Sequence, residues 1–450
     1  MSEPICTGAC IFGKCPNKTC VKYSQGGAHR AIKAEMSILT SGNLPKGPTG
    51  KSGFGIAVDI GTTTVAAYLY DFDKGECVAV ESAINPQVTF GVDVISRIKY
   101  CRDQEDGVHE LAASIRTCIN TLSAALCGKQ GIEPAQIIEM AVTGNTTMLH
   151  LFTDTDPSSM GEAPFTVPDY FGYTKNASQL GLICGGEVYI ARCMSAFVGG
   201  DITSAILSSG MREDDASLLL DIGTNGEVAL HANGKLYVTS TAAGPAFEGS
   251  ELFCGMAAVK GAVSAVYPLS GELQTSVIGG VSPKGICGSG VIDAIALMKT
   301  SGAMDETGRI LDSPLTTAVD GAPAFMVCEG VYITQRDVRR IQTAKSAIAA
   351  GTLALVNRAG LSIGDISRVY LAGGFGNYMD EENAITIGLL PEESRNIIKN
   401  IGNAAGAGAG MALVKGEYIS EHRSIADAAQ HVELSTDAYF MEKYIDCMMF

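Results

Sequence analysis

The sequence has no tryptophan, and only 18% of its 450 residues are charged. It also has no apolar run near the roughly 18 to 20 residues that a membrane-crossing helix needs. Its N-terminus is rich in cysteine and polar, unlike a secretion signal. We therefore expect a cytoplasmic protein that does not enter a membrane.

Basic residues are scarce as well. The chain carries 32 Lys and Arg against 48 Asp and Glu, which gives a net charge of −16. A nucleic-acid groove needs clustered basic side chains, so this balance argues against a nucleic-acid partner. It still allows a nucleotide site, because glycine turns and helix N-termini bind phosphate through backbone N–H groups.

Hydrophobic residues, glycine and cysteine are plentiful. Hydrophobic residues make up 46% of the chain, and the length of 450 residues suggests two or three domains with well-buried cores. The 53 glycines indicate many sharp turns and close backbone contacts. In a reducing compartment, the 14 cysteines are expected to be free thiols or metal ligands.

Two segments share one pattern. Residues 55–71 read GIAVDIGTTTVAAYLYD, and residues 218–234 read LLLDIGTNGEVALHANG. Each places an Asp-Ile-Gly-Thr turn between two apolar strands. The turn residues are Asp59, Gly61, Thr62, Thr63 and Thr64 in the first copy and Asp221, Gly223, Thr224, Asn225 and Gly226 in the second. The repeat predicts two related domains that face each other across a cleft.

The chemistry of these turns suits a phosphate. Glycine lets consecutive N–H groups converge on an anion, and threonine hydroxyls add donors. Asp59 and Asp221 are expected to hold Mg²⁺ or its water, which neutralises the phosphates. The same residue types also occur in ordinary hairpin turns, and the repetition weighs against that alternative.

A third glycine segment follows the second hairpin. Residues 369–380 read as an apolar strand that ends in Gly373, Gly374, Phe375 and Gly376, where an adenosine can lie against the backbone. The motif is weak alone and gains weight from its place after two phosphate hairpins. Elsewhere strands alternate with helical patterns, such as residues 91–103, 107–126 and 338–360, which predicts an α/β fold.

Two hairpins followed by LAGGFG resemble the superfamily of acetate and sugar kinases, Hsp70 and actin, known as ASKHA. Five longer stretches resemble the reductive activators of corrinoid-dependent enzymes: NPQVTFGVDVISRI, VTGNTTMLHLF, TAAGPAFEG, GICGSGVID and QTAKSAIAAG. The resemblance covers roughly residues 54–415. It implies duplicated actin/Hsp70-like (ribonuclease H-like) subdomains, 54–205 and 206–450, that flank an ATP cleft.

Activators of this kind use ATP to drive an electron from an iron–sulfur cluster to an inactive Co(II) corrinoid, giving Co(I). The implied partner is a corrinoid-binding methyltransferase or methyl-carrier protein. An upstream electron donor such as a ferredoxin or flavodoxin, and a homodimer, are implied as well. The implied cofactors are ATP, Mg²⁺ and an iron–sulfur cluster.

The N-terminus departs from the family pattern. Many members carry a plant-type ferredoxin domain there, whose cysteine signature is absent from this chain. Residues 1–24 instead hold Cys6, Cys10, Cys15 and Cys20, and residues 25–53 read as a flexible linker. One [4Fe–4S] cluster is the favoured interpretation, with [2Fe–2S] open; a structural zinc and unliganded thiols are alternatives.

The remaining candidates lie in the body of the chain. Asp201 follows two glycines at an expected helix start, so it either orients the attacking water or caps the helix. Glu227 is expected to reach the metal. The resemblance places Gln342 and Lys345 near the nucleotide, and a solvated helix face is the alternative. Cys254 and Cys287 are interpreted as small buried thiols rather than cluster ligands.

Three other functions stay open. A small-molecule kinase of the same fold could carry a zinc segment, although no base for a hydroxyl substrate is evident. A non-catalytic scaffold would bind ATP without turnover. An activator of the dehydratase type would transfer an electron without a corrinoid.

Overall fold

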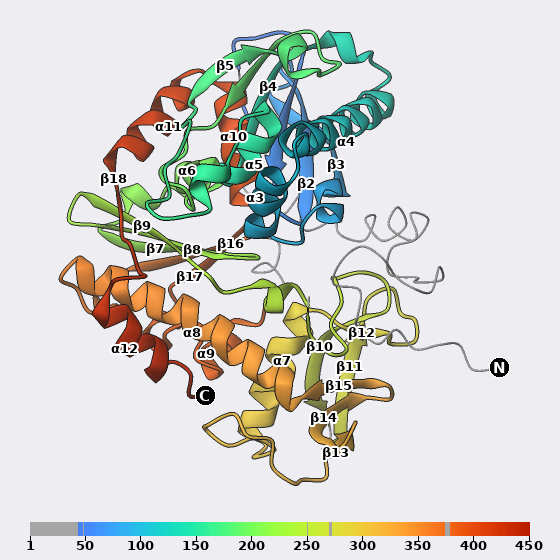
Figure 1. The fold of residues 1–450 in the computed structure, drawn as a ribbon, viewed down its shortest axis with the longest axis vertical. Helices are drawn as coiled ribbons and strands as arrows, with labels where there is room; N and C mark the ends of the chain where they lie inside the picture. Colours follow the sequence, from blue (N-terminus) through green and yellow to red (C-terminus); the bar gives the residue numbers. More distant parts are fainter. Residues whose placement is uncertain (1–43, 48, 250, 270–271, 374–378) are drawn as a thin grey trace.

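The structure is a computed structural model that describes residues 44–47, 49–249, 251–269, 272–373 and 379–450. Two lobes lie one above the other in Figure 1, each built on a six-stranded sheet. The predicted α/β fold is confirmed.

The first sheet has the strand order β3-β2-β1-β4-β6-β5. Three strands form an antiparallel meander, and β4 and β6 extend the sheet in parallel to β1. The bounds are β1 Phe54–Ile60, β2 Thr64–Asp71, β3 Glu76–Ile84, β4 Ile137–Gly144, β5 Tyr173–Asn176 and β6 Glu187–Ile190. The first predicted hairpin is therefore β1, a short turn and β2.

The second sheet repeats this plan in the order β17-β16-β7-β8-β9-β18. Read from the other end, β9-β8-β7-β16-β17 matches β3-β2-β1-β4-β6 strand by strand, and β16 is parallel to β7 as β4 is to β1. The bounds are β7 Ala216–Ile222, β8 Gly226–Ala232, β9 Lys235–Thr241, β16 Arg368–Ala372, β17 Ile398–Gly402 and β18 Ala429–His431. The duplication that the two Asp-Ile-Gly-Thr turns predicted is thus present in the topology.

Helices cover both sheets. α3 (Val94–Asp103), α4 (Gly107–Gln130) and α5 (Thr146–Thr153) contribute to one core of the first lobe, and α10 (Ala404–Val414) packs on the sheet through a second core. α5 begins after Asn145, whose side chain accepts the Met148 N–H and caps the helix. In the second lobe, α7 (Gly288–Thr300), α8 (Gln335–Arg358) and α9 (Glu381–Thr386) share the largest core.

Two helices connect the lobes. α6 (Gly200–Ser209) packs against the second sheet in a core that includes Leu219 and Val238, and it also contacts α10. α10 contacts β1 and β4 of the first sheet, and α11 (Glu417–Ala428) packs on α10. Both helices therefore lie beside the first lobe, although they come after β17 of the second sheet in sequence (Figure 1). The chain then returns through β18 to α12 (Ala438–Asp446), which packs on α8.

A region between β9 and α8 was not predicted. It contains two three-stranded sheets, β11-β10-β12 and β13-β14-β15. Their bounds are β10 Ala262–Leu269, β11 Glu272–Val277, β12 Gly285–Ile286, β13 Thr316–Val319, β14 Ala322–Cys328 and β15 Val331–Thr334. These strands extend the second lobe at the lower right of Figure 1.

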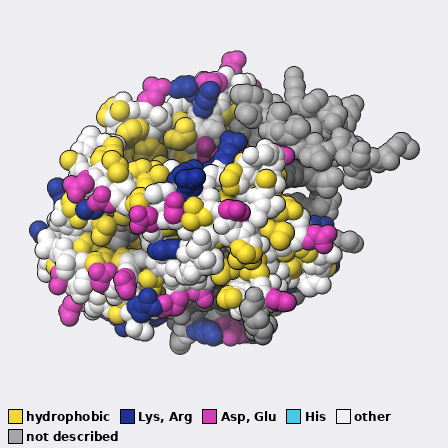
Figure 2. All heavy atoms as spheres, turned by 90° about the horizontal axis from the view of Figure 1, so that it is seen from below, with side chains coloured by type: hydrophobic (Ala, Val, Ile, Leu, Met, Phe, Trp, Pro, Cys, Tyr) yellow, Lys and Arg dark blue, Asp and Glu magenta, His cyan; other side chains and the backbone are white. Residues whose placement is uncertain are grey.

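None of the helices in the described ranges is long and apolar enough to cross a bilayer. Figure 2 shows the molecule from below, and on that face the described basic side chains are interspersed with acidic ones rather than gathered in a continuous strip.

Candidate nucleotide site between the two lobes

The turn of the first hairpin is supported from behind by a buried asparagine. Gly61 N–H donates to Thr64 O over 2.9 Å and closes the turn. Asn85 donates its side-chain N–H to Gly61 O (2.9 Å) and its backbone N–H to Thr63 O (2.8 Å). Asn85 is fully buried at the start of the 3₁₀ helix η3 (Pro86–Thr89), in the NPQVTF stretch.

A buried arginine supports the same turn. Arg97 on α3 donates from Nη2 to Thr62 O over 2.6 Å and from Nε to Gly91 O over 2.9 Å. Burial lowers its pKa to about 10, so the guanidinium stays charged at neutral pH. Asn145 donates to Thr62 Oγ1 over 3.0 Å.

These contacts occupy the backbone carbonyls of the first turn and leave two of its N–H groups available. The carbonyls of Gly61, Thr62 and Thr63 all accept hydrogen bonds from the protein, so none needs water or a cation. The N–H groups of Thr62 and Thr63 have no acceptor in the part of the chain that the structure describes. The turn can therefore offer donors to an anion, as predicted for a phosphate loop.

The second hairpin is closed by Gly223 N–H, which donates to Asn225 O over 2.9 Å. Gly226 must be glycine, because a Cβ there would lie 2.5 Å from Ile348 Cγ1 on α8. Gly373 has φ +91°, and a Cβ there would lie 2.7 Å from Asp221 Oδ1. The strand end at β16 thus lies directly against the second hairpin, and its contact with an adenosine stays a prediction.

The two hairpins meet at one carboxylate that the sequence analysis did not assign. Glu248, at the end of the 3₁₀ helix η8 (Pro245–Glu248), accepts from Thr63 Oγ1 at Oε2 and from Thr224 Oγ1 at Oε1, each over 3.0 Å. The two hydroxyl oxygens are 3.4 Å apart. The cleft between the lobes is therefore narrow enough for one small anionic group to contact both turns.

Asp59 and Asp221 occupy the last positions but one of β1 and β7. Burial raises the pKa of Asp59 to about 6, and the hydrogen bond from Asn403 partly offsets this. Burial, and then the charge of Asp59, raise the pKa of Asp221 to about 7. The two predicted metal-binding carboxylates thus repel each other inside the cleft.

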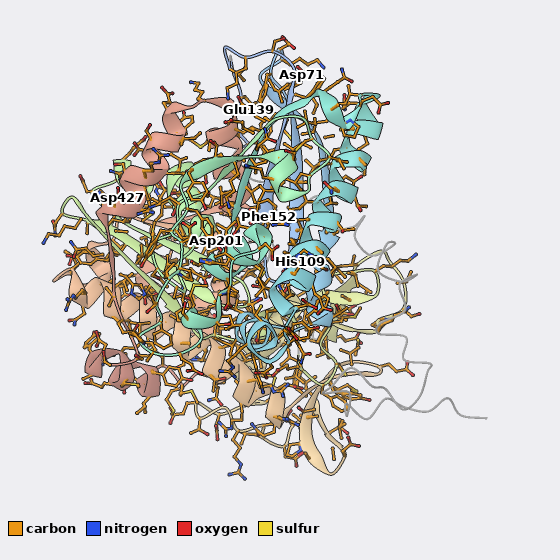
Figure 3. The ribbon with its side chains drawn as sticks, turned by 45° about the horizontal axis from the view of Figure 1, so that its top comes forward. Asp71, His109, Glu139, Phe152, Asp201 and Asp427 are labelled. Carbon is orange, nitrogen blue, oxygen red and sulfur yellow. The ribbon has the colours of Figure 1, made fainter. Side chains whose placement is uncertain are left out.

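Asp201 lies in the interior between the lobes, on the first turn of α6 (Figure 3). Burial, and then Asp221 and Asp59, raise its pKa to about 8. The helix N-cap is Gly199, and Asp201 Oδ1 accepts from the adjacent Ile202 N–H over 2.8 Å. The alternative that Asp201 is the N-cap is therefore wrong.

Glu227 joins the same group from β8. Burial is the largest cause of its raised pKa, followed by Asp201 and Asp221, and Ser240 donates to it over 3.1 Å. In the described ranges, no three His, Cys, Asp or Glu side chains form a ready-made metal site. The donor set suits a hydrated Mg²⁺ that also binds phosphate oxygens, because hard cations take carboxylate, phosphate and water oxygens together.

Gln342 and Lys345 are buried, which excludes the alternative of a solvated helix face. Lys345 Nζ donates to the carbonyls of Cys447, 2.6 Å away, and of Met449. Gln342 Nε2 donates to Met448 O over 2.7 Å. Burial lowers the pKa of Lys345 to about 8. Both side chains hold the C-terminal tail, and their contact with a nucleotide stays a prediction.

Several predicted site residues lie outside the described ranges. They are Cys6, Cys10, Cys15 and Cys20 at the N-terminus and Gly374, Phe375 and Gly376 after β16. Cys254 and Cys287 are described, and burial raises the pKa of both thiols. Cys287 is buried, as interpreted, whereas Cys254 is only partly buried.

Four site residues were missed by the sequence analysis: Asn85, Arg97, Glu248 and Asn403. Asn85, Arg97 and Glu248 lie in stretches that carried only the family resemblance, and Asn403 lies in none of the quoted stretches. The available signal was a polar side chain inside an apolar segment, because such a residue must find a buried partner.

Two family models cover the chain from residue 54 onward. One, described as the RACo middle region, matches residues 54–214, and the other, described as the C-terminal domain of RACo, the ASKHA domain, matches residues 215–450. Among curated proteins, the corrinoid activation enzyme RamQ of Eubacterium limosum is 36% identical over 445 residues, covering 92% of this chain and 74% of RamQ.

Two further proteins are similar. The Co(II) methylated amine-specific corrinoid protein reductase of Methanosarcina barkeri is 25% identical over 432 residues, covering 87% of this chain and 76% of the reductase. The solved structure of a reductive activator for corrinoid, iron–sulfur protein has a TM-score of 0.81 at 36% identity, covering 89% of this chain. The match spans 66% of that structure, just under two thirds of its length. The chain therefore belongs to the RACo family of reductive activators of corrinoid proteins, as its motifs indicated.

Proposed function

We propose that this protein uses ATP to drive the one-electron reduction of a Co(II) corrinoid on a partner protein to Co(I). The observation that carries the ATP part is the convergence of Thr63 and Thr224, one from each lobe, on a single carboxylate. The relatives support the corrinoid part, since one is called a corrinoid activation enzyme and another a corrinoid protein reductase.

The residues have separate tasks in this proposal. The N–H groups and hydroxyls of the two hairpins bind the phosphates, and Asp59 and Asp221 bind the hydrated Mg²⁺. Bound Mg²⁺ would neutralise phosphate charge. Asp201 orients the water that attacks the terminal phosphate and accepts its proton. Burial, Asp221 and Asp59 raise its pKa, and a cation bound at Asp59 and Asp221 would favour the ionised carboxylate that this role needs.

Hydrolysis can drive an uphill electron transfer only through two conformations of different nucleotide affinity. In this proposal the lobes supply these conformations, because a phosphate that enters between Thr63 and Thr224, whose hydroxyl oxygens are 3.4 Å apart, changes the spacing of turns that belong to different sheets. This change alters the surface that the protein offers to its corrinoid partner. We further propose that the partner is a methyltransferase or methyl-carrier protein, and that two copies of this chain form a dimer.

The proposed reaction also needs an electron carrier, and we place it in the N-terminal segment. Cys6, Cys10, Cys15 and Cys20 would hold an iron–sulfur cluster, [4Fe–4S] in the favoured interpretation, which supplies a one-electron donor of low potential. One electron leaves this donor for each Co(II) reduced, and a ferredoxin or flavodoxin restores it.

One anaerobic preparation of the full chain tests the proposal. Iron and sulfide content are measured beside zinc, and Co(II) loss is followed by its absorbance in the presence of MgATP and a reduced donor. Replacing the four N-terminal cysteines with alanine is expected to abolish Co(II) reduction and to leave ATP binding intact. Cys118→Ala, a change on α4, is the matched control.

Two results would contradict the proposal. Zinc without iron, together with a phosphorylated small molecule, would favour the kinase with a zinc segment. Unchanged Co(II) reduction in the four-cysteine variant would remove the N-terminal segment from the electron path.

A further inference from the structure

Glu248 connects the lobes in a way that the proposed chemistry must disrupt. Its two carboxylate oxygens each accept one hydroxyl hydrogen bond of 3.0 Å, from Thr63 in the first lobe and Thr224 in the second. These are the hydroxyls proposed to bind phosphate. A carboxylate and a phosphoryl group both present a pair of anionic oxygens, so they compete for the same two donors.

The competition is also electrostatic. Burial raises the pKa of Glu248, whereas the hydrogen bonds from Thr63 and Thr224 favour the ionised carboxylate. Two anions cannot share this site without repulsion, because the two hydroxyl oxygens that they would both contact are only 3.4 Å apart. A phosphate that enters between the hairpins must therefore displace the Glu248 side chain.

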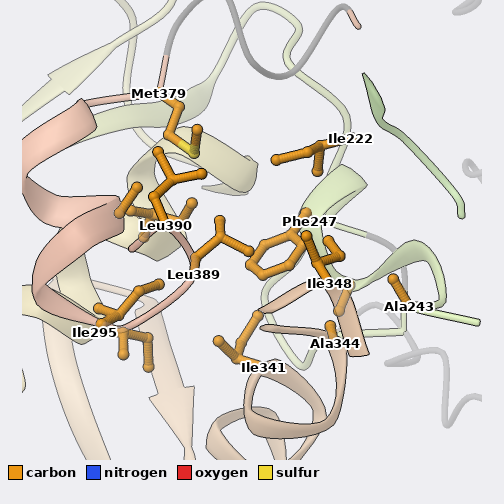
Figure 4. Packing of buried hydrophobic residues seen from close by; sticks show 14 of the residues in the cluster. Ile222, Ala243, Phe247, Ile295, Ile341, Ala344, Ile348, Met379, Leu389 and Leu390 are labelled. Carbon is orange, nitrogen blue, oxygen red and sulfur yellow. The ribbon is translucent and has the colours of Figure 1, made fainter. Parts of the chain in front are cut away.

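The backbone around Glu248 is firmly held. Phe247 is buried, and Figure 4 shows its ring packed among Ile348 and Leu389. Gly249 has φ +76°, and a Cβ there would lie 2.3 Å from Met256 O. The carboxylate is thus presented to the hairpins by a fixed turn and is not a freely mobile surface side chain.

We propose that Glu248 is a resident occupant of the phosphate position and sets the nucleotide preference of the site. This inference rests on the proposed function. A nucleotide whose phosphates reach both hairpins displaces the carboxylate and meets its repulsion. A nucleoside monophosphate, which is too short to engage both turns, leaves Glu248 in place. Glu248 therefore makes the binding affinity depend on how many phosphates the nucleotide carries.

A purely structural role of Glu248 would lead to the opposite result in a binding experiment. If Glu248 only held the lobes together, loss of its charge would loosen the cleft and weaken MgATP binding. If it competes with phosphate, loss of its charge strengthens MgATP binding. The direction of change in affinity separates the two roles.

The experiment measures MgATP and AMP binding by calorimetry to the full-length wild type, Glu248→Gln, Glu248→Ala and Thr63→Val. We expect Glu248→Gln and Glu248→Ala to bind MgATP about tenfold more tightly, because a like-charge contact is removed. AMP binding is expected to stay unchanged. Thr63→Val, which removes a phosphate donor, is expected to weaken MgATP binding. Glu272→Gln, an exposed change on β11 with the same change in net charge, is the control.

Weaker or unchanged MgATP binding by a folded Glu248→Gln protein would overturn the inference. Equal tightening of AMP binding would also overturn it, since the effect would then not depend on phosphate length. A wild type that binds no MgATP would instead contradict the proposed function. These outcomes are distinct because the first two require a wild type that binds.

Discussion

Asn403 donates a side-chain N–H to Asp59 Oδ2 over 2.9 Å, although the two residues are 344 positions apart. Its Oδ1 accepts the Gly406 N–H over 2.8 Å and caps α10. One amide thus fixes the start of a helix and the carboxylate at the end of β1. This hydrogen bond opposes the effect of burial on the pKa of Asp59, which favours an ionised metal ligand.

Asn403→Asp is expected to separate these two tasks. The new carboxylate can still accept the Gly406 N–H, but it faces Asp59 with a like charge. We expect stability to fall by only about 1 kcal/mol and MgATP affinity to fall about tenfold, because Asp59 becomes harder to ionise. Urea unfolding and calorimetry measure the two quantities.

Asp437→Ala is the matched control for this change. Asp437 caps α12 by accepting the Phe440 N–H and has no contact with the cleft in the described structure. Its loss is expected to lower stability by about 1 kcal/mol without changing MgATP affinity. Normal nucleotide affinity in Asn403→Asp would show that Asp59 does not depend on the amide.

The crowded carboxylates predict a pH dependence of stability. The folded-state pKa values are raised to about 6 for Asp59, about 7 for Asp221 and about 8 for Asp201. Their unfolded values are near 3.9. Between these limits the folded state binds more protons than the unfolded state, so the free energy of unfolding falls as the pH rises.

The window for this measurement is pH 6.5 to 8. Burial lowers the pKa of His422 to about 3 and that of Lys345 to about 8, so both groups act in the opposite direction. The contribution of His422 fades above the ordinary histidine pKa of about 6.5, that of Lys345 grows only as the pH approaches 8, and the three carboxyl groups outweigh them in between. Urea unfolding of the nucleotide-free protein should show stability decreasing across this window, with a smaller decrease in Asp201→Asn. A slope that is unchanged by this substitution would remove Asp201 from the coupled group.

The sequence predicted those parts of the fold and site in which residue chemistry and the local hydrophobic pattern point to the same element. Both hairpins were predicted because an Asp-Ile-Gly-Thr turn between alternating apolar strands is a local signal, and its repetition indicated the duplicated sheets. Gly373 followed from its position at the end of an apolar strand.

Long-range partners could not be predicted in the same way. Glu248 reaches Thr63 across 185 positions, and Lys345 holds carbonyls about one hundred positions away, at Cys447 (102) and Met449 (104). Hydrophobic period and turn chemistry describe neighbours in the chain, and neither specifies which distant segment supplies a partner. The same limit explains why α10, placed by sequence in residues 206–450, covers the first sheet.

Arg97→Lys tests the support behind the first hairpin. A lysine ammonium cannot bond to Thr62 O and Gly91 O with the planar geometry of the guanidinium, so one buried carbonyl loses its donor. We expect stability to fall by about 2 kcal/mol and MgATP affinity to fall with it. Arg102→Lys, an exposed change on the same helix, should alter stability by less than about 0.5 kcal/mol. Unfolding curves that coincide for both variants would contradict this role.

Gly408→Ala tests the contact between α10 and α6. A Cβ at Gly408 would lie 2.1 Å from Ser204 O, a backbone atom that cannot turn aside. α6 must therefore shift, and it carries Asp201 one turn before Ser204. We expect a loss of about 1 to 3 kcal/mol in unfolding free energy and a lower rate of ATP hydrolysis. Gly128→Ala on α4, where a Cβ meets nothing within 4 Å, should instead raise stability by about 0.5 to 1 kcal/mol. Normal hydrolysis in a destabilised Gly408→Ala protein would show that the position of Asp201 tolerates movement of its helix.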